Sequence, residues 1–352
     1  MLSRKLSSAT ASSTQFLAVG LNVAGSYPFQ VWQWNSSTGI GSAVASPLSA
    51  IGVAVTRLAF APRGDALALS LNSSVTPVAA YAFSKNGFGS RFSSPSTLPP
   101  ARCNSVSFSP DGDFVALGVQ NSPFIFVYAW SSSSGFGAKV SNPVTLPPAA
   151  GTATTFHPEG SAVAVTHSTS PRVTVYAWSS AGFGTKFADP SPAPVSGVPT
   201  SVTFSPSGDA LAMSVDQPPY LHAYAWSGSG FGSKYPDPSS ALFGAAYGIA
   251  FSPSGEAIGS CHVETGATLL SFYAWSSSTG FGTQYPRVTV RTSSTPSDLA
   301  FSPYGDAVGV TLDPGTLALY PWSDLTGLGT AYSTSGVSIP DPTTSIAFGS
   351  AT

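Results

Sequence analysis

Charged residues are scarce in this chain. Of its 352 residues only 8% are Asp, Glu, Lys or Arg, and the formal net charge is −2, whereas about a quarter of a soluble domain is usually charged. A surface that binds nucleic acid needs a clustered basic excess, because it must neutralise phosphates. The composition therefore excludes nucleic acid as the expected partner.

Cysteines and long apolar segments are also scarce. The two cysteines, Cys103 and Cys261, cannot form a disulfide framework, and no run approaches the 18 apolar residues of a membrane-spanning helix. The first residues include Arg4 and Lys5 but continue into Ser and Thr without an apolar core, unlike a secretory signal. We expect a protein that folds in a reducing cytoplasm and is not inserted into a membrane.

The chain is nonetheless rich in core-forming residues. Hydrophobic residues make up 42% and aromatic residues 12% of the sequence, which is enough for a sizeable core. The 35 Gly and 31 Pro residues fall at regular intervals. This regularity indicates turns rather than low complexity.

Three phrases repeat along the whole chain. The anchor Phe of the phrase F-S-P-x-G-D recurs with spacings of 48, 48, 48, 47, 50 and 47 residues, at Phe60, Phe108, Phe156, Phe204, Phe251, Phe301 and Phe348. The phrase Y-A-W follows, with its last ring at Phe83, Trp130, Trp178, Trp226, Trp275 and Trp322, and with Trp34 as the seventh. The phrase G-F-G, or G-I-G or G-L-G, lies a few residues further on.

Each repeat unit predicts four short strands. The first strand ends at the anchor Phe, S-P-x-G-D is a tight turn, and the second strand is apolar, as in ALALSL. The third strand carries Y-A-W, and we place the fourth around KFADP or KYPDP. Four strands per 40–50 residues, repeated seven times, predict an all-β, seven-bladed β-propeller.

The phase of the repeat predicts how the ring closes. The chain begins inside a unit, with FLAVGL as a second strand, and ends on SIAFGS, a first strand with nothing after it. We therefore expect the C-terminal strand to complete the N-terminal blade, since an open sheet edge invites aggregation. Residues 1–12 are predicted to be an N-terminal arm, and residues 13–352 the propeller.

The repeat resembles a known family. F-S-P-x-G-D followed by an apolar strand and Y-A-W is similar to the WD40-type propeller repeat over nearly the whole chain, although the Gly-His pair and the Asp after Trp are missing. The phrase Y-A-W-S-S-x-G-F-G also resembles propellers encoded in environmental bacteriophage genomes. The resemblance implies that the loop after each second strand and the segment before each first strand share one face.

On that face we predict a possible partner or ligand surface around the channel mouth. Its polar and aromatic residues are Asn22, Asn72, Gln120, Ser168, Asp216, Tyr220, Tyr247 and Asp313. The unit between Phe251 and Phe301 is the longest, and we place its extra residues in a loop around Val263 to Ala267. These side chains could bind a ligand or could merely be hydrated.

A second candidate surface lies at the rim. Basic residues follow G-F-G in four consecutive units, at Arg91, Lys139, Lys186 and Lys234. They form an arc that could meet an acidic partner or an anionic glycan. Asp189 and Asp237 follow two of the lysines by three residues and are expected to neutralise them, so a solvated rim is the competing interpretation.

No combination of residues points to catalysis. The four histidines lie on scattered blades without a nucleophile phrase. Cys261, His262 and Glu264 could be metal ligands, but alternate strand residues point to opposite faces, and a closed zinc site needs four ligands. We expect no enzyme, no metal and no cofactor.

The sequence therefore predicts a non-enzymatic structural or adhesion protein that acts through protein contacts. Its most concrete form is a bacteriophage virion component on the tail or capsid, made in the host cytoplasm and present in multiple copies of a symmetric assembly. Its partners would be other virion or scaffold proteins, or a host-surface glycan. The alternatives are a cytoplasmic interaction scaffold and a glycan-binding propeller, because the fold does not choose among functions.

Overall fold

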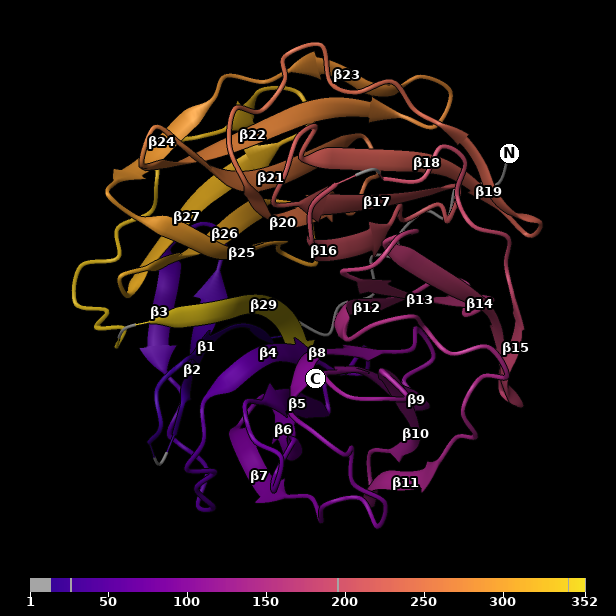
Figure 1. The fold of residues 1–352 in the computed structure, drawn as a ribbon. Helices are drawn as coiled ribbons and strands as arrows, with labels where there is room; N and C mark the ends of the chain where they lie inside the picture. The colour runs from indigo at the N-terminus through magenta and orange to yellow at the C-terminus, as the bar shows by residue number, and fades with distance from the viewer. Residues whose placement is uncertain (1–13, 26, 195, 341, 352) are drawn as a thin grey trace.

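The computed structural model describes residues 14–25, 27–194, 196–340 and 342–351. These residues form 29 strands joined by turns and linkers, and no helix occurs among them (Figure 1). In particular, no described helix is long and apolar enough to cross a membrane. The predicted arm, residues 1–12, lies outside the described residues.

The strands form seven sheets, which are the blades of a β-propeller. Blade 1 contains β29 (Thr343–Ala351), β1 (Thr14–Leu21), β2 (Phe29–Asn35) and β3 (Gly39–Ala43). Blade 2 contains β4 (Val55–Phe60), β5 (Ala66–Leu71), β6 (Val78–Ser84) and β7 (Gly87–Arg91). Blade 3 contains β8 (Cys103–Phe108), β9 (Phe114–Val119), β10 (Ile125–Ser131) and β11 (Gly135–Lys139).

The remaining blades repeat this order. Blade 4 contains β12 (Gly151–Phe156), β13 (Ala162–His167), β14 (Val173–Ser179) and β15 (Gly182–Lys186), and blade 5 contains β16 (Pro199–Phe204), β17 (Ala210–Val215), β18 (Leu221–Ser227) and β19 (Gly230–Lys234). Blade 6 contains β20 (Ala246–Phe251), β21 (Ala257–Glu264), β22 (Ala267–Ser276), β23 (Gly280–Gln284) and β24 (Val288–Thr292). Blade 7 contains β25 (Thr295–Phe301), β26 (Ala307–Asp313), β27 (Thr316–Ser323) and β28 (Gly327–Leu328).

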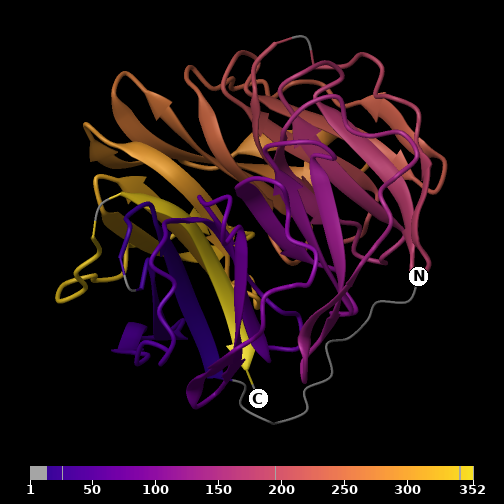
Figure 2. The ribbon, with the colours of Figure 1, turned by 60° about the horizontal axis from the view of Figure 1, so that its bottom comes forward.

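The first strands of neighbouring blades contact one another in ring order, from β4 through β8, β12, β16, β20 and β25 to β29, which returns to β4. They are therefore the innermost strands, and the blades are arranged around the axis that these strands surround (Figure 2). The second strands are almost wholly buried, as in Ala66–Leu71, because neighbouring blades cover both of their faces. This packing explains why these strands are continuous apolar runs rather than alternating ones.

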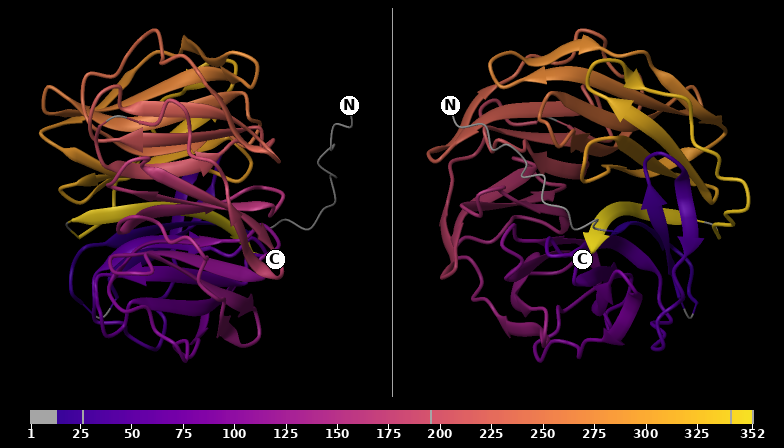
Figure 3. Two further views of the ribbon diagram at one scale, coloured as in Figure 1. Left: turned by 45° about the vertical axis from the view of Figure 1, so that its right-hand side comes forward. Right: turned by 180° about the vertical axis from the view of Figure 1, so that it is seen from behind.

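The predicted closure of the ring is confirmed. Strand β29 pairs antiparallel with β1, with Leu17 opposite Phe348, and β1 pairs with β2 in the same sheet. The view from behind shows this last strand in yellow beside the first strands in indigo (Figure 3). The register shifts between Gly20 and Leu21. The two chain ends thus complete one blade without leaving the edge of β1 open.

Each blade holds a cluster of aromatic rings. In blade 5 the Trp226 ring meets Phe204 at 5.4 Å and Phe231 at 5.0 Å, both from its own blade, and these contacts are edge-to-face. A third ring, Phe187, comes from the linker after the preceding blade, with its centroid 5.0 Å from that of Trp226. The ring that bridges two blades is therefore supplied by the linker, a contact that the repeat phrases did not identify.

Two predicted details are wrong. The fourth strand begins at G-F-G and ends at the following Lys, so the residues ADP of KFADP lie in the linker, where Pro190 has no N–H to donate to a sheet. In blade 6 the residues around Val263 to Ala267 extend strands β21 and β22 into a long hairpin. Its turn is Thr265–Gly266, both with positive φ, which suits a two-residue hairpin. Strand β24 covers the outer edge of this extension.

Candidate functional site

Two charged residues lie in the channel wall where the other blades have small side chains. The position three residues before each anchor Phe is small in five blades, at Ser105, Ala153, Ser201, Gly248 and Ser345. In blade 2 it is Arg57, and in blade 7 it is Asp298. Because both residues hold the same position in the repeat, their side chains lie at the same level of the ring.

The Arg57 guanidinium reaches across the closing strand. Its Nη1 donates to the carbonyl oxygen of Thr344 on β29, and also to that of Ser297 on β25 at 3.5 Å. Arg57 thus contacts two blades other than its own. Arg57 is half-buried.

The Asp298 carboxylate approaches strand β29 from blade 7. Its Oδ1 accepts the N–H of Leu299 at 3.0 Å, and its Oδ2 accepts the N–H of Ile346 on β29 at 3.3 Å. Burial raises the pKa of the Asp298 carboxyl above its usual value, and the Arg57 charge opposes this rise. A carboxylate with a raised pKa is a stronger base than an exposed one.

The position four residues before the anchor Phe carries a hydroxyl or amide side chain in several blades. The residue four positions before the anchor Phe donates to a carbonyl of the next blade in four places: Thr56 to Cys103 at 2.6 Å, Asn104 to Gly151 at 2.9 Å, Thr200 to Ala246 at 2.7 Å and Ser297 to Thr343 at 2.8 Å. These bonds tie the innermost strands together.

The predicted mouth residues do share one face. The backbone N–H groups of Asn22, Asn72, Gln120 and Asp216 each donate to the segment that precedes the innermost strand of the same blade. We call this surface, made of the loops after the second strands and the segments before the first strands, the mouth face. Asn22, Asn72, Gln120, Ser168 and Asp313 are exposed on it, whereas Asp216, Tyr220 and Tyr247 are half-buried.

An arginine that sequence reasoning missed joins two of these residues. Arg102 donates from Nη1 to Asn72 Oδ1 and from Nη2 to Gln120 Oε1, each at 3.3 Å. Asn104 also donates to Gln120 Oε1, at 3.4 Å. Asp216 instead accepts the N–H of Val198 at 2.6 Å in its own blade. The predicted mouth residues are therefore spread around the face, with one cluster between blades 2 and 3.

The predicted rim residues lie on the outermost strands β7, β11, β15 and β19. Lys186 and Lys234 form ion pairs with Asp189 and Asp237, as their spacing suggested. Lys139 donates to the Val140 carbonyl at 3.1 Å and lies over the Phe126 ring at 4.7 Å. The basic residues of the arc thus make separate local contacts.

Three of the four histidines are buried and have a lowered pKa. Burial lowers the pKa of His167, His222 and His262 to about 4. His262 Nε2 lies 3.9 Å from Glu264 Oε2, but that carboxylate also faces Arg287, whose Nη1 is 3.3 Å away. Within the described ranges, no three His, Cys, Asp or Glu side chains are grouped in a way that could hold a metal ion.

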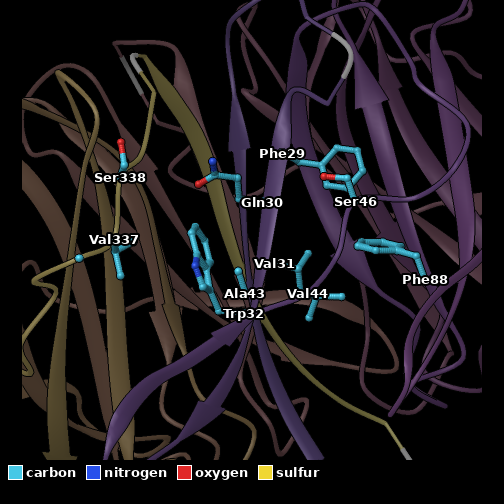
Figure 4. Close-up of a pocket in the computed structure, with 11 residues that line it drawn as sticks. Phe29, Gln30, Val31, Trp32, Ala43, Val44, Ser46, Phe88, Val337 and Ser338 are labelled. Atoms are coloured by element: carbon cyan, nitrogen blue, oxygen red, sulfur yellow. The ribbon is translucent and has the colours of Figure 1, made fainter.

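A cavity of about 290 Å³ lies beside blade 1 (Figure 4). Phe29, Val31 and Trp32 of β2 line it, with Val44 on one side and Val337 on the other. None of the residues that line it is charged. It therefore offers apolar contact without acid–base chemistry, and the channel pair Arg57–Asp298 remains the better candidate for a reaction.

These features define a seven-bladed β-propeller with a polar channel and one charged pair. No protein-family model and no curated protein sequence matches this chain. Solved structures do match it. A Bacteroides uniformis protein provisionally named 6-phosphogluconolactonase has a TM-score of 0.73 at 16% identity, with 95% of this chain and 99% of that chain covered.

Two further structures show the same fold. The periplasmic gluconolactonase of Pseudomonas aeruginosa matches with a TM-score of 0.72 at 18% identity and covers 96% of this chain and 99% of its own. The β-propeller domain of Myceliophteria thermophila Cps50 (Swd1) matches with a TM-score of 0.57 at 14% identity, over 82% of this chain and 87% of that chain. At these identities the likeness shows the propeller fold alone.

The prediction that this protein is not an enzyme is corrected by these matches. Two of the three similar structures are named as lactonases, so this fold, over its full length, carries enzymes. That prediction rested on the absence of local motifs such as a nucleophile phrase. In a propeller, residues from distant blades meet at the channel, and such a site leaves no motif in the sequence.

Proposed function

We propose that the protein hydrolyses a small cyclic ester, of the sugar-lactone class, in the channel beside strand β29. Asp298 is the general base and Arg57 is the cation that stabilises the oxyanion. The observation that carries this proposal is the buried carboxylate of Asp298, whose pKa is raised, beside the only other charged side chain at its level of the ring.

The chemistry of the step matches these two groups. Asp298 takes a proton from a water molecule, whose oxygen then bonds to the ester carbonyl carbon, and the carbonyl electrons move to its oxygen. The Arg57 guanidinium stabilises that negative charge. The ring C–O bond then breaks, and the leaving alkoxide takes the proton back from Asp298. The product is an open-chain hydroxy acid.

The surroundings support a hydroxyl-rich substrate. Thr56, Asn104 and Thr200 add polar side chains to the innermost strands, and Arg102 lies on the mouth face. Sugar hydroxyls need such convergent donors and acceptors for orientation. The full-length similarity to structures named as lactonases supports the same substrate class.

The test is the hydrolysis of δ-gluconolactone by purified protein, followed as acid release at constant pH. We expect a rate proportional to protein concentration and above the buffer rate. D298N and R57Q should each lower it by about 100-fold, the scale of one lost base or oxyanion donor. The control is E159Q, which changes an exposed carboxyl in the turn between β12 and β13 and should act like the parent. A parent rate equal to that of buffer would refute the proposal.

A second proposal is a role in a bacteriophage virion, through contacts with other proteins. It is supported by aliphatic side chains that project into solvent from outer loops, with relative exposures of 102% for Leu48, 104% for Val144 and 88% for Leu325. Such residues, on a chain with few charges, favour protein contacts. Mass spectrometry of purified particles tests it: detection in particles supports a virion component, and detection only in infected-cell lysate contradicts it.

A further inference from the structure

The cavity beside blade 1 lies where other blades hold a long basic side chain. In blades 2 to 5 the residue that ends the fourth strand, and pairs in register with the tyrosine of the third, is Arg91, Lys139, Lys186 or Lys234. In blade 1 this position is Ala43, which pairs with Trp32. Because the alanine side chain ends at Cβ, it leaves open the space that a lysine or arginine stem takes in four blades. Ala43 lines the cavity at this point (Figure 4).

Blade 3 shows how a lysine is held at this position. The Lys139 ammonium donates to the Val140 carbonyl at 3.1 Å and to Asn142 Oδ1 at 2.5 Å. It also lies 4.7 Å from the centroid of the Phe126 ring. All three partners are uncharged. The repeat therefore holds an ammonium group here with two oxygen acceptors and the face of an aromatic ring.

Blade 1 keeps the equivalent acceptor positions without the lysine. The residues one and three positions after Ala43 are Val44 and Ser46, where blade 3 has Val140 and Asn142. The backbone hydrogen bond that joins this segment to the third strand is 2.8 Å long in both blades. Val44 and Ser46 also line the cavity. The Val44 carbonyl and the Ser46 hydroxyl therefore offer an ammonium group the two acceptor positions that Lys139 uses in blade 3.

Blade 1 also adds an acceptor of its own. Gln30 lines the cavity, and its Oε1 is buried without a hydrogen-bond partner among the described residues. The equivalent residues of the other blades have no side-chain amide: they are Ala79, Phe126, Thr174, His222, Ser271 and Ala318. A buried oxygen without a partner costs free energy until a donor reaches it. A ligand that carries several N–H donors satisfies it.

A second substitution in blade 1 widens the space. In blades 2 to 6 the tyrosine hydroxyl of the third strand donates to a carbonyl of the linker that precedes the blade: Tyr81 to Ser49, Tyr128 to Thr97, Tyr176 to Thr145, Tyr224 to Pro192 and Tyr273 to Ser240. Trp32 has no hydroxyl to make this bond, and the cavity extends from Trp32 to Val337 of the preceding linker. An indole ring is also the strongest aromatic partner for a cation.

We propose that this cavity binds an alkylammonium group, which is the end of a lysine side chain or of a free aliphatic amine. The ammonium takes the place that Lys139 Nζ has in blade 3, beside the Val44 carbonyl and the Ser46 hydroxyl. Its methylene chain lies along Trp32. The inference goes beyond the proposed hydrolysis, because the cavity lies beside the outer strands of blade 1 and contains neither residue of the channel pair.

The test is a titration of the full chain with n-butylammonium, which is a lysine side chain without its backbone, followed by saturation-transfer NMR. We expect saturable binding with a dissociation constant on the order of 1 mM, the scale for a ligand of about five non-hydrogen atoms. The neutral alcohol n-butanol has the same shape without the charge and should bind at least about tenfold more weakly. A parent chain without saturable binding, or equal binding of n-butanol, overturns the proposal.

Variants locate the binding in this cavity. A43K supplies the lysine of blades 3 to 5 from the chain itself, so it should weaken binding at least about tenfold while the melting temperature stays close to that of the parent. Q30A should weaken binding about fivefold, the scale of one hydrogen bond. The control is A331K, the same substitution at the equivalent position of blade 7, which does not line the cavity. An A43K variant that binds like the parent overturns the proposal.

Two further probes identify the source of the amine. Nα-acetyl-lysine methylamide presents the group as a peptide side chain does, and cadaverine presents it as a free diamine. The one that binds more tightly than n-butylammonium shows which source the surroundings of the cavity favour. These outcomes do not involve lactone hydrolysis, so the two proposals fail separately.

Discussion

The outside and the channel of this ring depart from the seven-fold repeat in different ways. Outside, five linkers supply an aromatic ring to the next blade, at Phe92, Phe187, Tyr235, Tyr285 and Tyr332. After blades 1 and 3 the same position is Val44 or Val140. In those two blades an alanine near the start of the second strand is replaced by Phe16 or Phe114, whose ring reaches the same neighbour, at 4.8 Å from Phe83 and 5.2 Å from Trp178.

The outer departures thus keep one bridging ring at every blade interface. In the channel, Arg57 and Asp298 add charge at a level where five blades pack small residues. The ring does not need these charges for packing, because most blades do without them. When a second substitution restores the volume that a first one changes, the pair is structural. A substitution that adds a charge whose burial costs free energy is instead a candidate for function.

Removal of the closing strand β29 should lower the stability of the fold more than any other change. A chain ending before Thr343 lacks β29, which exposes the edge of β1 and removes the carbonyl and amide groups that hold Arg57 and Asp298. We expect no cooperative unfolding transition and strong aggregation, measured by circular dichroism and sedimentation. A truncated chain that melts like the full one would contradict the account of closure.

Loss of a bridging ring should come next. F114A removes the ring beside Trp178 and should lower the free energy of unfolding by about 2 kcal/mol, less than the loss of a fully buried Phe, because Phe114 is half-buried. Denaturant unfolding measures this change.

The exchange of the two sites provides the control. F114A/V140F restores the combination of the other five interfaces, Ala in the strand and an aromatic residue in the linker. We expect it to recover most of the loss. If the double variant is as unstable as the sum of the two single variants, the rings do not substitute for each other.

A smaller effect is expected from pH. The folded-state pKa of His222, about 4, lies below its unfolded value of about 6.5. The unfolded chain therefore binds more protons between these values, and stability falls as pH drops from 6.5 to 4. H222F, which introduces the residue found at the equivalent Phe126, should raise the melting temperature by a few degrees more at pH 5 than at pH 8. An equal change at both values would contradict this.

The architecture was predictable because a repeat reports the same physical environment seven times. The anchor Phe spacing established the number of blades, and the incomplete first and last units established how the ring closes. The bridging rings were harder to predict. The linker position that holds these rings is Phe, Tyr or Val. Its role in bridging two blades becomes clear only when Val140 is considered together with Phe114.

The channel pair could have been found in part. Aligning the residues three positions before each anchor Phe shows Arg57 and Asp298 as the charged exceptions. That both side chains bond to β29 could not be predicted, because it depends on β29 lying between blades 2 and 7 and on the reach of the two side chains. Likewise Arg102 precedes its strand in an unremarkable linker, and only the fold places it between Asn72 and Gln120.

The pH dependence of δ-gluconolactone hydrolysis tests the central claim most directly. If Asp298 is the base, kcat/KM should rise with pH through a pKa above about 3.9, the value of an unperturbed Asp, because burial disfavours its charged form. D298N should lose that ascending limb together with about 100-fold in rate, while its melting temperature stays close to that of the parent. A parent protein that does not accelerate hydrolysis at any pH, or a D298N variant with the parent profile, would contradict the account.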